Sequence, residues 1–283
     1  MEEEKRHYNR TIVPIIEAVY SNLTPLEKNI ADFFIKNTEK KDFSSKSISE
    51  KLFVSEASLS RFAKKCGFKG YREFIFQYEA SFSDNEKKID DLTESVLNSY
   101  HQLLYKSFTL VDEEQMHRIA KMLSEKSRVF IYGMGSSGLV AQEMKLRFMR
   151  LGLDIEAISD THVMKMNSVL LNKNCLVIGI SVSGKTKEVI SSMRTAKLHG
   201  ASTILISANK SHELMDICDE ILLIGVLKNL EMGNVISPQF PVLVMIDIFY
   251  SYYLNTDYYH KSEMFSSTLN ALYEENKKNI KQE

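Results

Sequence analysis

The sequence is poor in cysteine and has almost no net charge. Its 283 residues contain three cysteines, Cys66, Cys175 and Cys218, which are odd in number and far apart. No Cys-x-x-Cys pair and no Cys/His cluster accompanies them, so neither a disulfide framework nor a zinc site is expected. The formal net charge of −1 at pH 7 gives no sign of a polyanion partner for the chain as a whole.

Long apolar runs are also missing. Met1–Arg10 is charged and lacks the apolar core of a signal peptide, and no run approaches the length of a membrane span. The chain has no internal repeat and no low-complexity tract. Its hydrophobic content of 44% is typical of a globular protein. These features predict a cytoplasmic location, reduced thiols and no membrane partner.

The most informative stretch of the chain is Ile178–Thr186. The apolar run Cys175–Ile180 predicts a buried strand, and a helical pattern follows from Glu188 to His199. A helix that begins behind such a turn offers free N–H groups and a dipole that favours an anion. One ordinary N-cap needs one hydroxyl, whereas this turn has three, so the pattern favours an anion site over a simple capped loop. The small and hydroxyl residues of the turn are Ser181, Ser183, Gly184 and Thr186.

A second turn of the same kind lies upstream. Arg128–Tyr132 predicts a strand, Gly133–Gly138 fits Gly-x-Gly-x-x-Gly, and a helix is expected over Leu139–Arg150. A dinucleotide site is one interpretation, with Glu156 near the end of the next strand, Leu153–Ile158, as the acidic residue. A second hydroxyl-rich turn has no obvious use in a dinucleotide site. Two such turns in one sheet favour a small phosphorylated ligand held between them.

Residues 128 to about 255 resemble a SIS (sugar isomerase) domain, a phosphosugar-binding α/β module. The resemblance depends on Gly133-x-Gly135-x-Ser137 and Ser181-x-Ser183-Gly184-x-Thr186. It implies that the second motif holds phosphate and that Ser137 contacts the ligand. Asp160 and His162, which follow the second strand, have a weaker implied role. The implied ligand-binding set is Gly135, Ser136, Ser137, Asp160, His162, Ser181, Ser183, Gly184 and Thr186.

Residues 11–82 read as helices throughout. Thr24 is expected to cap a helix that has Pro25 in its first position and Glu27 completing a capping box. Ser47–Leu52 opens a short helix, and Ser55 is expected to cap another over Glu56–Cys66. Two short helices joined by a brief turn are typical of a helix-turn-helix motif.

The second of these helices has a basic outer face. Leu59, Phe62 and Ala63 are expected in the core, which leaves small, hydroxyl and basic side chains outside to approach a groove and its phosphates. Phe43–Arg72 contains seven Lys or Arg against two Glu. A solvated face of a small helical bundle is the alternative interpretation. The candidate DNA-binding residues are Ser55, Ala57, Ser58, Ser60, Arg61, Lys64, Lys65 and Lys69.

Leu23–Phe82 resembles the N-terminal domain of the RpiR family of bacterial transcription regulators, which joins this domain to a SIS domain. The matching stretches are Leu23–Glu27, Val54–Phe62 and Gly67–Tyr71. The resemblance implies a regulator of carbohydrate-metabolism genes that binds operator DNA, senses a sugar phosphate and forms a homo-oligomer, a dimer or a tetramer. Three positions depart from the family pattern, and none removes a phosphate-binding hydroxyl. They are Ser60, Val182 and Ser207.

The expected fold is an all-α helix-turn-helix domain over 1–82, a linker over 83–93, and an α/β domain over 94–283. The latter has a parallel, flavodoxin-like sheet with flanking helices. No cofactor, metal or catalytic residue is expected. A sugar-phosphate isomerase or another SIS-domain enzyme is the alternative, since proton transfer beside a carbonyl needs a Glu or His base. The candidate bases, none in a catalytic context, are His162, His199, His212 and Glu231.

Overall fold

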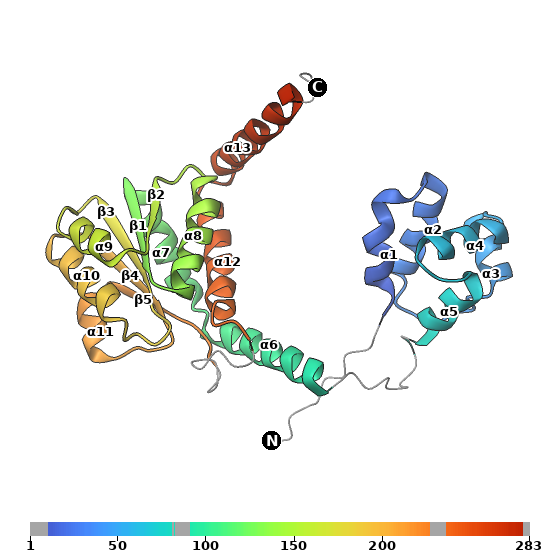
Figure 1. Cartoon of the computed structure of the whole chain (residues 1–283), viewed down its shortest axis with the longest axis horizontal. Coiled ribbons are helices and arrows are strands. Elements are labelled where there is room, and N and C mark those ends of the chain that lie inside the picture. The colour runs from blue at the N-terminus through green and yellow to red at the C-terminus, as the bar shows by residue number, and fades with distance from the viewer. Residues whose placement is uncertain (1–10, 81, 83–90, 227–235, 280–283) are drawn as a thin grey trace. The chain divides into compact units, whose positions relative to one another are not determined.

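The computed structural model describes residues 11–80, 82, 91–226 and 236–279. The chain divides into two compact units, Met1–Asp91 and Leu92–Glu283, which are considered separately below (Figure 1). Residues 83–90, most of the predicted linker, and Glu231 lie outside the described residues.

Unit 1 is all helical, as predicted, and the predicted cap at Ser55 and capping box at Thr24 are both confirmed. Its core is rich in aromatic rings. Phe34 stands at the centre of this core, with Phe62, Phe74 and Tyr78 packed around it. The elements are α1 (Val13–Val19), a 3-10 turn (Tyr20–Asn22), α2 (Pro25–Lys36), α3 (Ser45–Leu52), α4 (Glu56–Lys65) and α5 (Tyr71–Ala80).

Unit 2 is built on a five-stranded parallel sheet with the order β2-β1-β3-β4-β5. The predicted parallel α/β fold is therefore confirmed. The strands are β1 (Arg128–Gly133), β2 (Ile155–Ile158), β3 (Cys175–Ile180), β4 (Ser202–Ser207) and β5 (Glu220–Leu223). The helices are α6 (Asp91–Leu110), α7 (Glu113–Glu125), α8 (Ser136–Met149), α9 (Thr161–Ser168), α10 (Lys187–Leu198), α11 (His212–Ile217), α12 (Phe240–Asn255) and α13 (Tyr258–Asn279).

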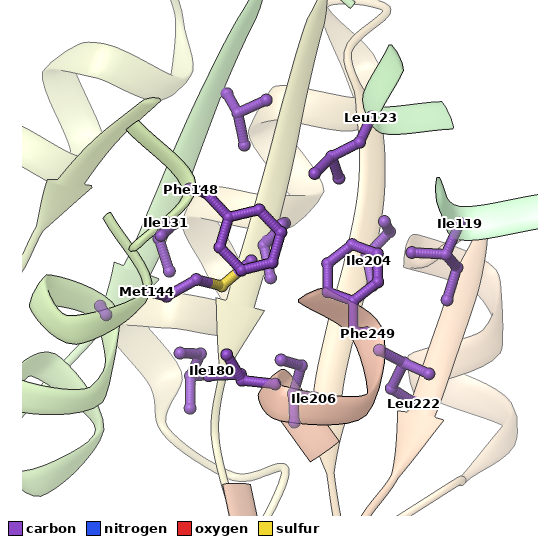
Figure 2. Packing of buried hydrophobic residues seen from close by; sticks show 14 of the residues in the cluster. Ile119, Leu123, Ile131, Met144, Phe148, Ile180, Ile204, Ile206, Leu222 and Phe249 are labelled. Atoms are coloured by element: carbon purple, nitrogen blue, oxygen red, sulfur yellow. The ribbon is translucent and has the colours of Figure 1, made fainter. Parts of the chain in front are cut away.

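Helices cover both faces of the sheet. Neighbouring side chains of a strand point to opposite faces, so each strand contributes to both hydrophobic clusters. Leu176 and Ile178 of β3 belong to the cluster formed with α7, α8 and α12, and Val177 belongs to the cluster formed with α9, α10 and α11. Figure 2 shows the first cluster, in which Phe148 of α8 and Phe249 of α12 lie against the sheet. Sheet strands buried on both faces account for the continuous apolar runs in the sequence.

The helix after the first glycine-rich turn begins earlier than predicted. It starts at Ser136 rather than at Leu139, because Gly135 takes φ 55 and ψ −128 and turns the chain directly into the helix. Residues that carry a side chain rarely adopt this backbone conformation, whereas glycine adopts it readily. Ser136 and Ser137 therefore belong to the first turn of α8.

Candidate functional site

The two hydroxyl-rich turns lie side by side at the carboxyl edge of the sheet. The first follows β1 and the second follows β3, and these strands are neighbours in register, with Gly133 opposite Ile180. From β1 the chain passes to α8 on one face, and from β3 it passes to α10 on the other. In open α/β sheets, such a reversal of direction between neighbouring strands marks the place at the strand ends where ligands bind.

Glycines shape the turn after β1. A Cβ on Gly133 would lie 2.7 Å from the Ser137 carbonyl oxygen, and a Cβ on Gly138 would lie 2.7 Å from the Ser159 hydroxyl oxygen. Gly135 is the N-cap of α8 and provides no side-chain hydrogen bond. Within the described chain the hydroxyls of Ser136 and Ser137 have no hydrogen-bond partner, so they are open to a ligand. The N–H groups of Ser137 and Gly138 donate to the carbonyls of Met134 and Gly135, at 3.1 and 3.0 Å, which leaves the Ser136 N–H without a backbone partner at the start of α8 in the described chain.

Hydroxyls hold the turn after β3 in shape. Ser181 is 2% exposed, and its Oγ lies 2.9 Å from Oγ1 of Thr186. The Lys185 N–H donates to Oγ of Ser183, which is only partly buried, at 3.2 Å. Thr186 is the N-cap of α10, and its side chain makes no capping bond, so the helix N-terminus is free of a side-chain cap. Ser181 and Thr186 therefore fix the loop, while Ser183 and the α10 N–H groups face outward.

Ser207 supports this turn from the next strand, a role that the sequence analysis did not assign. It is fully buried at the end of β4, where its Oγ donates to the Val182 carbonyl at 3.3 Å and accepts from the Asn209 N–H at 3.1 Å. Gly184 has φ 68, and a Cβ there would lie 3.1 Å from the same Oγ. The signal for Ser207 was its place at the end of a parallel strand, at the same edge as the two turns.

Asp160 and His162 have a different arrangement. Asp160 is the N-cap of α9 and accepts hydrogen bonds from the N–H groups of His162 and Val163, both at 2.9 Å. The bond from Val163 is the main cause of the lowered pKa of the Asp160 carboxyl. Burial opposes this effect, and the bond from His162 adds to the lowering. Capping thus accounts for Asp160, and no described contact joins it or His162 to either turn.

In unit 1, α3 and α4 form the helix-turn-helix motif. The Ser58 N–H donates to Oγ of Ser55 at 3.1 Å, and Ser45 joins the starts of the two helices through a 2.5 Å hydrogen bond to Glu56. Leu59, Phe62 and Ala63 are fully buried, as predicted.

The prediction that Ser58 lies on the outer face is wrong. Ser58 is 5% exposed, and its Oγ lies 2.9 Å from Oγ of Ser55 and 3.1 Å from a guanidinium nitrogen of Arg61. The hydroxyl is occupied by the cap of its own helix, a local pairing common for serine in a first turn. Ser60 is partly buried. The remaining candidate DNA-binding residues are exposed, namely Ser55, Ala57, Arg61, Lys64, Lys65 and Lys69.

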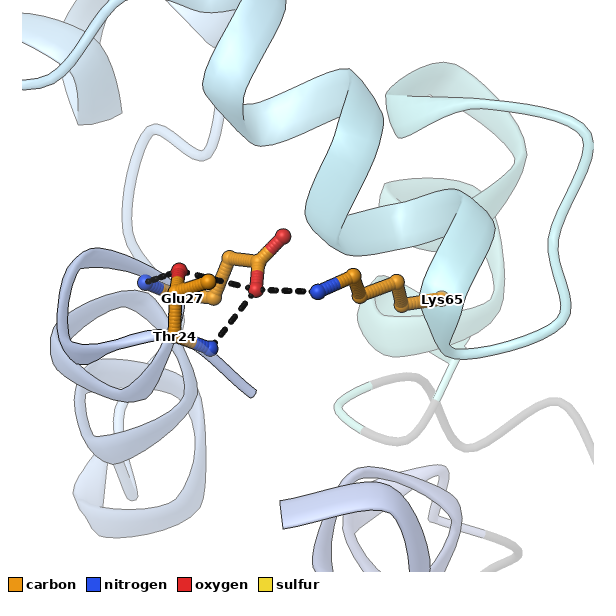
Figure 3. Close-up of polar contacts among 3 residues, drawn as sticks. All are labelled: Thr24, Glu27 and Lys65. Atoms are coloured by element: carbon orange, nitrogen blue, oxygen red, sulfur yellow. Dashed lines mark hydrogen bonds and ion pairs between the residues drawn. The ribbon is translucent and has the colours of Figure 1, made fainter. Parts of the chain in front are cut away.

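Lys64 and Lys65 differ in their surroundings. The Lys65 ammonium donates to Oε2 of Glu27 at 2.7 Å, and the same oxygen accepts from the N–H and hydroxyl of Thr24 (Figure 3). Burial raises the pKa of Glu27, but the bonds from Lys65 and Thr24 outweigh it and leave that pKa below its usual value. Within the described chain Lys64 is exposed and makes no ion pair.

No group of three or more His, Cys, Asp or Glu side chains suited to a metal occurs among the described residues. The three cysteines are free and buried. Burial raises the pKa of the Cys66 thiol to about 11 and that of Cys218 to about 12, which leaves both thiols protonated at neutral pH. No helix of the described ranges is both long and apolar enough to cross a membrane.

Comparison with known families matches both units. Residues 10–85 match the helix-turn-helix domain of the rpiR family, and residues 122–245 match the SIS domain. Together the two matches cover more than half of the chain.

Similar proteins extend over both units. An HTH-type transcriptional regulator of Haemophilus influenzae is 28% identical over 92% of this chain and 96% of its own length. The HTH-type transcriptional regulator RpiR of Escherichia coli K12 is 24% identical over 84% of each chain. Among solved structures, the Vibrio vulnificus NanR protein complexed with ManNAc-6P shares the fold, with a TM-score of 0.60 and 19% identity over 93% of this chain and 98% of that one.

Proposed function

Since the chain belongs to the rpiR family of helix-turn-helix transcription regulators, with a SIS domain behind the DNA-binding domain, we propose that it binds operator DNA through α4 and senses a sugar phosphate between the turns after β1 and β3. The observation that carries the proposal is the meeting of two turns at neighbouring strand ends, one with the open hydroxyls of Ser136 and Ser137 and the other with the uncapped N-terminus of α10.

The ligand half of the proposal follows from the donors at this edge. A phosphate needs several hydrogen-bond donors, and the N-terminal N–H groups of α10 supply them together with a favourable helix dipole. The N-terminus of α8 adds a second favourable dipole. Ser137 and Ser183 add partly buried hydroxyls whose O–H groups have no acceptor within the described chain, while Ser181, Thr186 and Ser207 keep the second turn in place. The NanR protein, whose structure contains bound ManNAc-6P, has the same fold, which supports a phosphosugar as the class of ligand.

The DNA half depends on the exposed face of α4. Ser55 and Ala57 stand at the N-terminal end of the helix, where helix-turn-helix proteins contact base edges, and Arg61 and Lys64 lie one and two turns further on. Such motifs bind paired half-sites as dimers, so a homo-oligomer, a dimer or a tetramer, is part of the proposal. The ligand alters operator affinity only through its different affinities for two arrangements of that oligomer.

An isomerase is the alternative, and the described histidines do not favour it. Nδ1 of His199 is held 2.9 Å from the Thr195 carbonyl at the C-terminal end of α10, at the opposite edge of the sheet from the two turns. His162 is exposed beside the α9 cap. His199 therefore cannot move a proton on a ligand held between the two turns, and no described contact directs His162 towards them, so we propose a sensor without catalytic activity.

The test is a thermal-shift screen of the full chain against hexose, pentose, amino-sugar and N-acetyl-amino-sugar phosphates. Each is compared with its unphosphorylated sugar and with NAD. A ligand at 100 times its Kd stabilises the folded state by about 2.7 kcal/mol, so a phosphosugar should raise the Tm and its parent sugar should not. A shift with NAD alone would contradict the proposal, and turnover of the stabilising phosphosugar would support the isomerase.

A further inference from the structure

Phe53, in the turn between α3 and α4, is an exposed aromatic side chain. It is 94% exposed, the largest exposed fraction among the large apolar side chains of the described residues. It stands two residues before Ser55, the N-cap of α4. A phenyl ring that contacts so little of its own chain adds almost nothing to folding through burial.

The backbone of Phe53 is strained as well. It has φ 54 and ψ 45, and across the described ranges no other residue except glycine has a positive φ. The Val54 N–H donates to the Ser49 carbonyl at 3.0 Å, which is the 6→1 bond of a Schellman motif with Phe53 at its left-handed position. Glycine is the usual residue there, because a Cβ crowds the following carbonyl oxygen.

Apart from this hydrogen bond, no contact of the Phe53 side chain compensates for the strain within the described part of unit 1. The apolar contact that accompanies a Schellman motif is supplied by Val54, which is partly buried against the helical core. The Phe53 ring, by contrast, is almost entirely exposed. A strained, exposed aromatic residue therefore points to a contact that forms only in a complex.

We propose that Phe53 is an apolar DNA contact that packs on deoxyribose carbons or a thymine methyl group where α4 enters the groove. This inference depends on the proposed function of α4. Ser55 and Ala57, which are exposed two and four positions after Phe53, are residues that such a helix brings to base edges. Phenyl rings are among the side chains that make apolar contacts with thymine methyl groups.

The test uses the full chain and a 30-base-pair duplex that the wild-type protein enriches from a randomised library. Binding is measured by fluorescence anisotropy at several salt concentrations. Phe53→Gly should weaken binding at least about tenfold, the size of one base-edge contact. Its Tm should equal or exceed that of the wild type, because glycine relieves the left-handed strain. The slope of log Kd against log salt should not change, since no charge is removed.

Phe53→Asn is the second variant, because asparagine tolerates the left-handed region yet offers no apolar ring. It should behave like Phe53→Gly. If both variants bind the duplex as tightly as the wild type, or if both change only the sedimentation coefficient of the free protein, Phe53 is not a DNA contact. Enrichment of no duplex by the wild-type protein would instead overturn the proposed function itself.

Discussion

Two adjacent lysines on α4 have different surroundings and therefore different expected roles. Lys64 is exposed and unpaired in the described chain, whereas Lys65 is held by the buried carboxylate of Glu27. Lys64→Ala should weaken DNA binding and reduce the salt slope by about one, as expected for a single lost phosphate contact. Anisotropy titrations from low to physiological salt measure both quantities.

Lys65→Ala is the matched control. It should leave the salt slope nearly unchanged and lower the free energy of unfolding by about 1–2 kcal/mol, because Glu27 then keeps a buried charge with fewer partners. Urea denaturation measures this loss. A slope that falls equally in both variants would mean that Lys65 leaves Glu27 to contact DNA.

Glu27 also gives unit 1 a defined response to acid. Its folded-state pKa lies below the ordinary value of 4.5, so the stability it contributes is complete above that value. As the pH falls below about 4.5 the unfolded state takes up the proton first, and this stability is lost as the pH falls through the lower folded-state pKa. Stability curves of the wild type and Glu27→Gln between pH 7 and pH 3 should therefore converge towards the acid end, and parallel curves would contradict the assignment.

The two serines of the turn after β3 should separate binding from stability. Ser183→Ala removes a partly exposed hydroxyl and should weaken phosphosugar binding by about tenfold with little change in Tm. Ser181→Ala leaves the Thr186 hydroxyl without its buried partner and should also cost about 1 kcal/mol of stability. Thermal-shift titrations of both variants with the stabilising phosphosugar test this, and equal losses of Tm would count against the division of roles.

At the residue scale, the sequence predicted what depends on near neighbours. The capping box of Thr24 and Glu27 was visible from its spacing of three. The pairing of Lys65 with Glu27 was not, because the partners are 38 positions apart. Ser58 was predicted to be exposed from the helical spacing of the apolar residues alone. That spacing does not show that the Ser58 hydroxyl contacts Ser55, the N-cap of the same helix.

At the element scale, the strands were the easiest to predict. β3 was predicted with its observed bounds, because a strand buried on both faces is a continuous apolar run. The start of α8 was predicted three residues late. Gly135 looked like part of a loop, and only its backbone angles show that the helix begins directly behind it.

At the scale of the whole molecule, we predict how the full chain unfolds on heating. Each unit has its own hydrophobic core, so calorimetry should show two transitions. Ser55→Ala removes the N-cap of α4 and should lower only one of them, by about 1 kcal/mol in free energy. The stabilising phosphosugar should raise only the other. A single transition shifted by both changes would show that the units unfold together.

The meeting of the two turns at the carboxyl edge of the sheet could not be derived from local sequence patterns alone. Both turns were recognisable from their glycines and hydroxyls, but their meeting depends on β1 and β3 being neighbours. Strand order is a long-range property that local patterns do not encode. Ser207 was missed as a support for the same reason, since its partners Val182 and Asn209 become neighbours only through the β3–β4 pairing and the turn beyond β4.

The separation of the two turns from the two cores also bears on how such a protein diversifies. Gly133–Gly138 and Ser181–Thr186 occupy the rim of the sheet, whereas the side chains that stabilise it fill the layers below. If the effector binds between these turns, as we propose, exchange of a few residues there changes which effector is recognised without disturbing the hydrophobic cores. A lineage of regulators can then acquire new effectors while it keeps one framework.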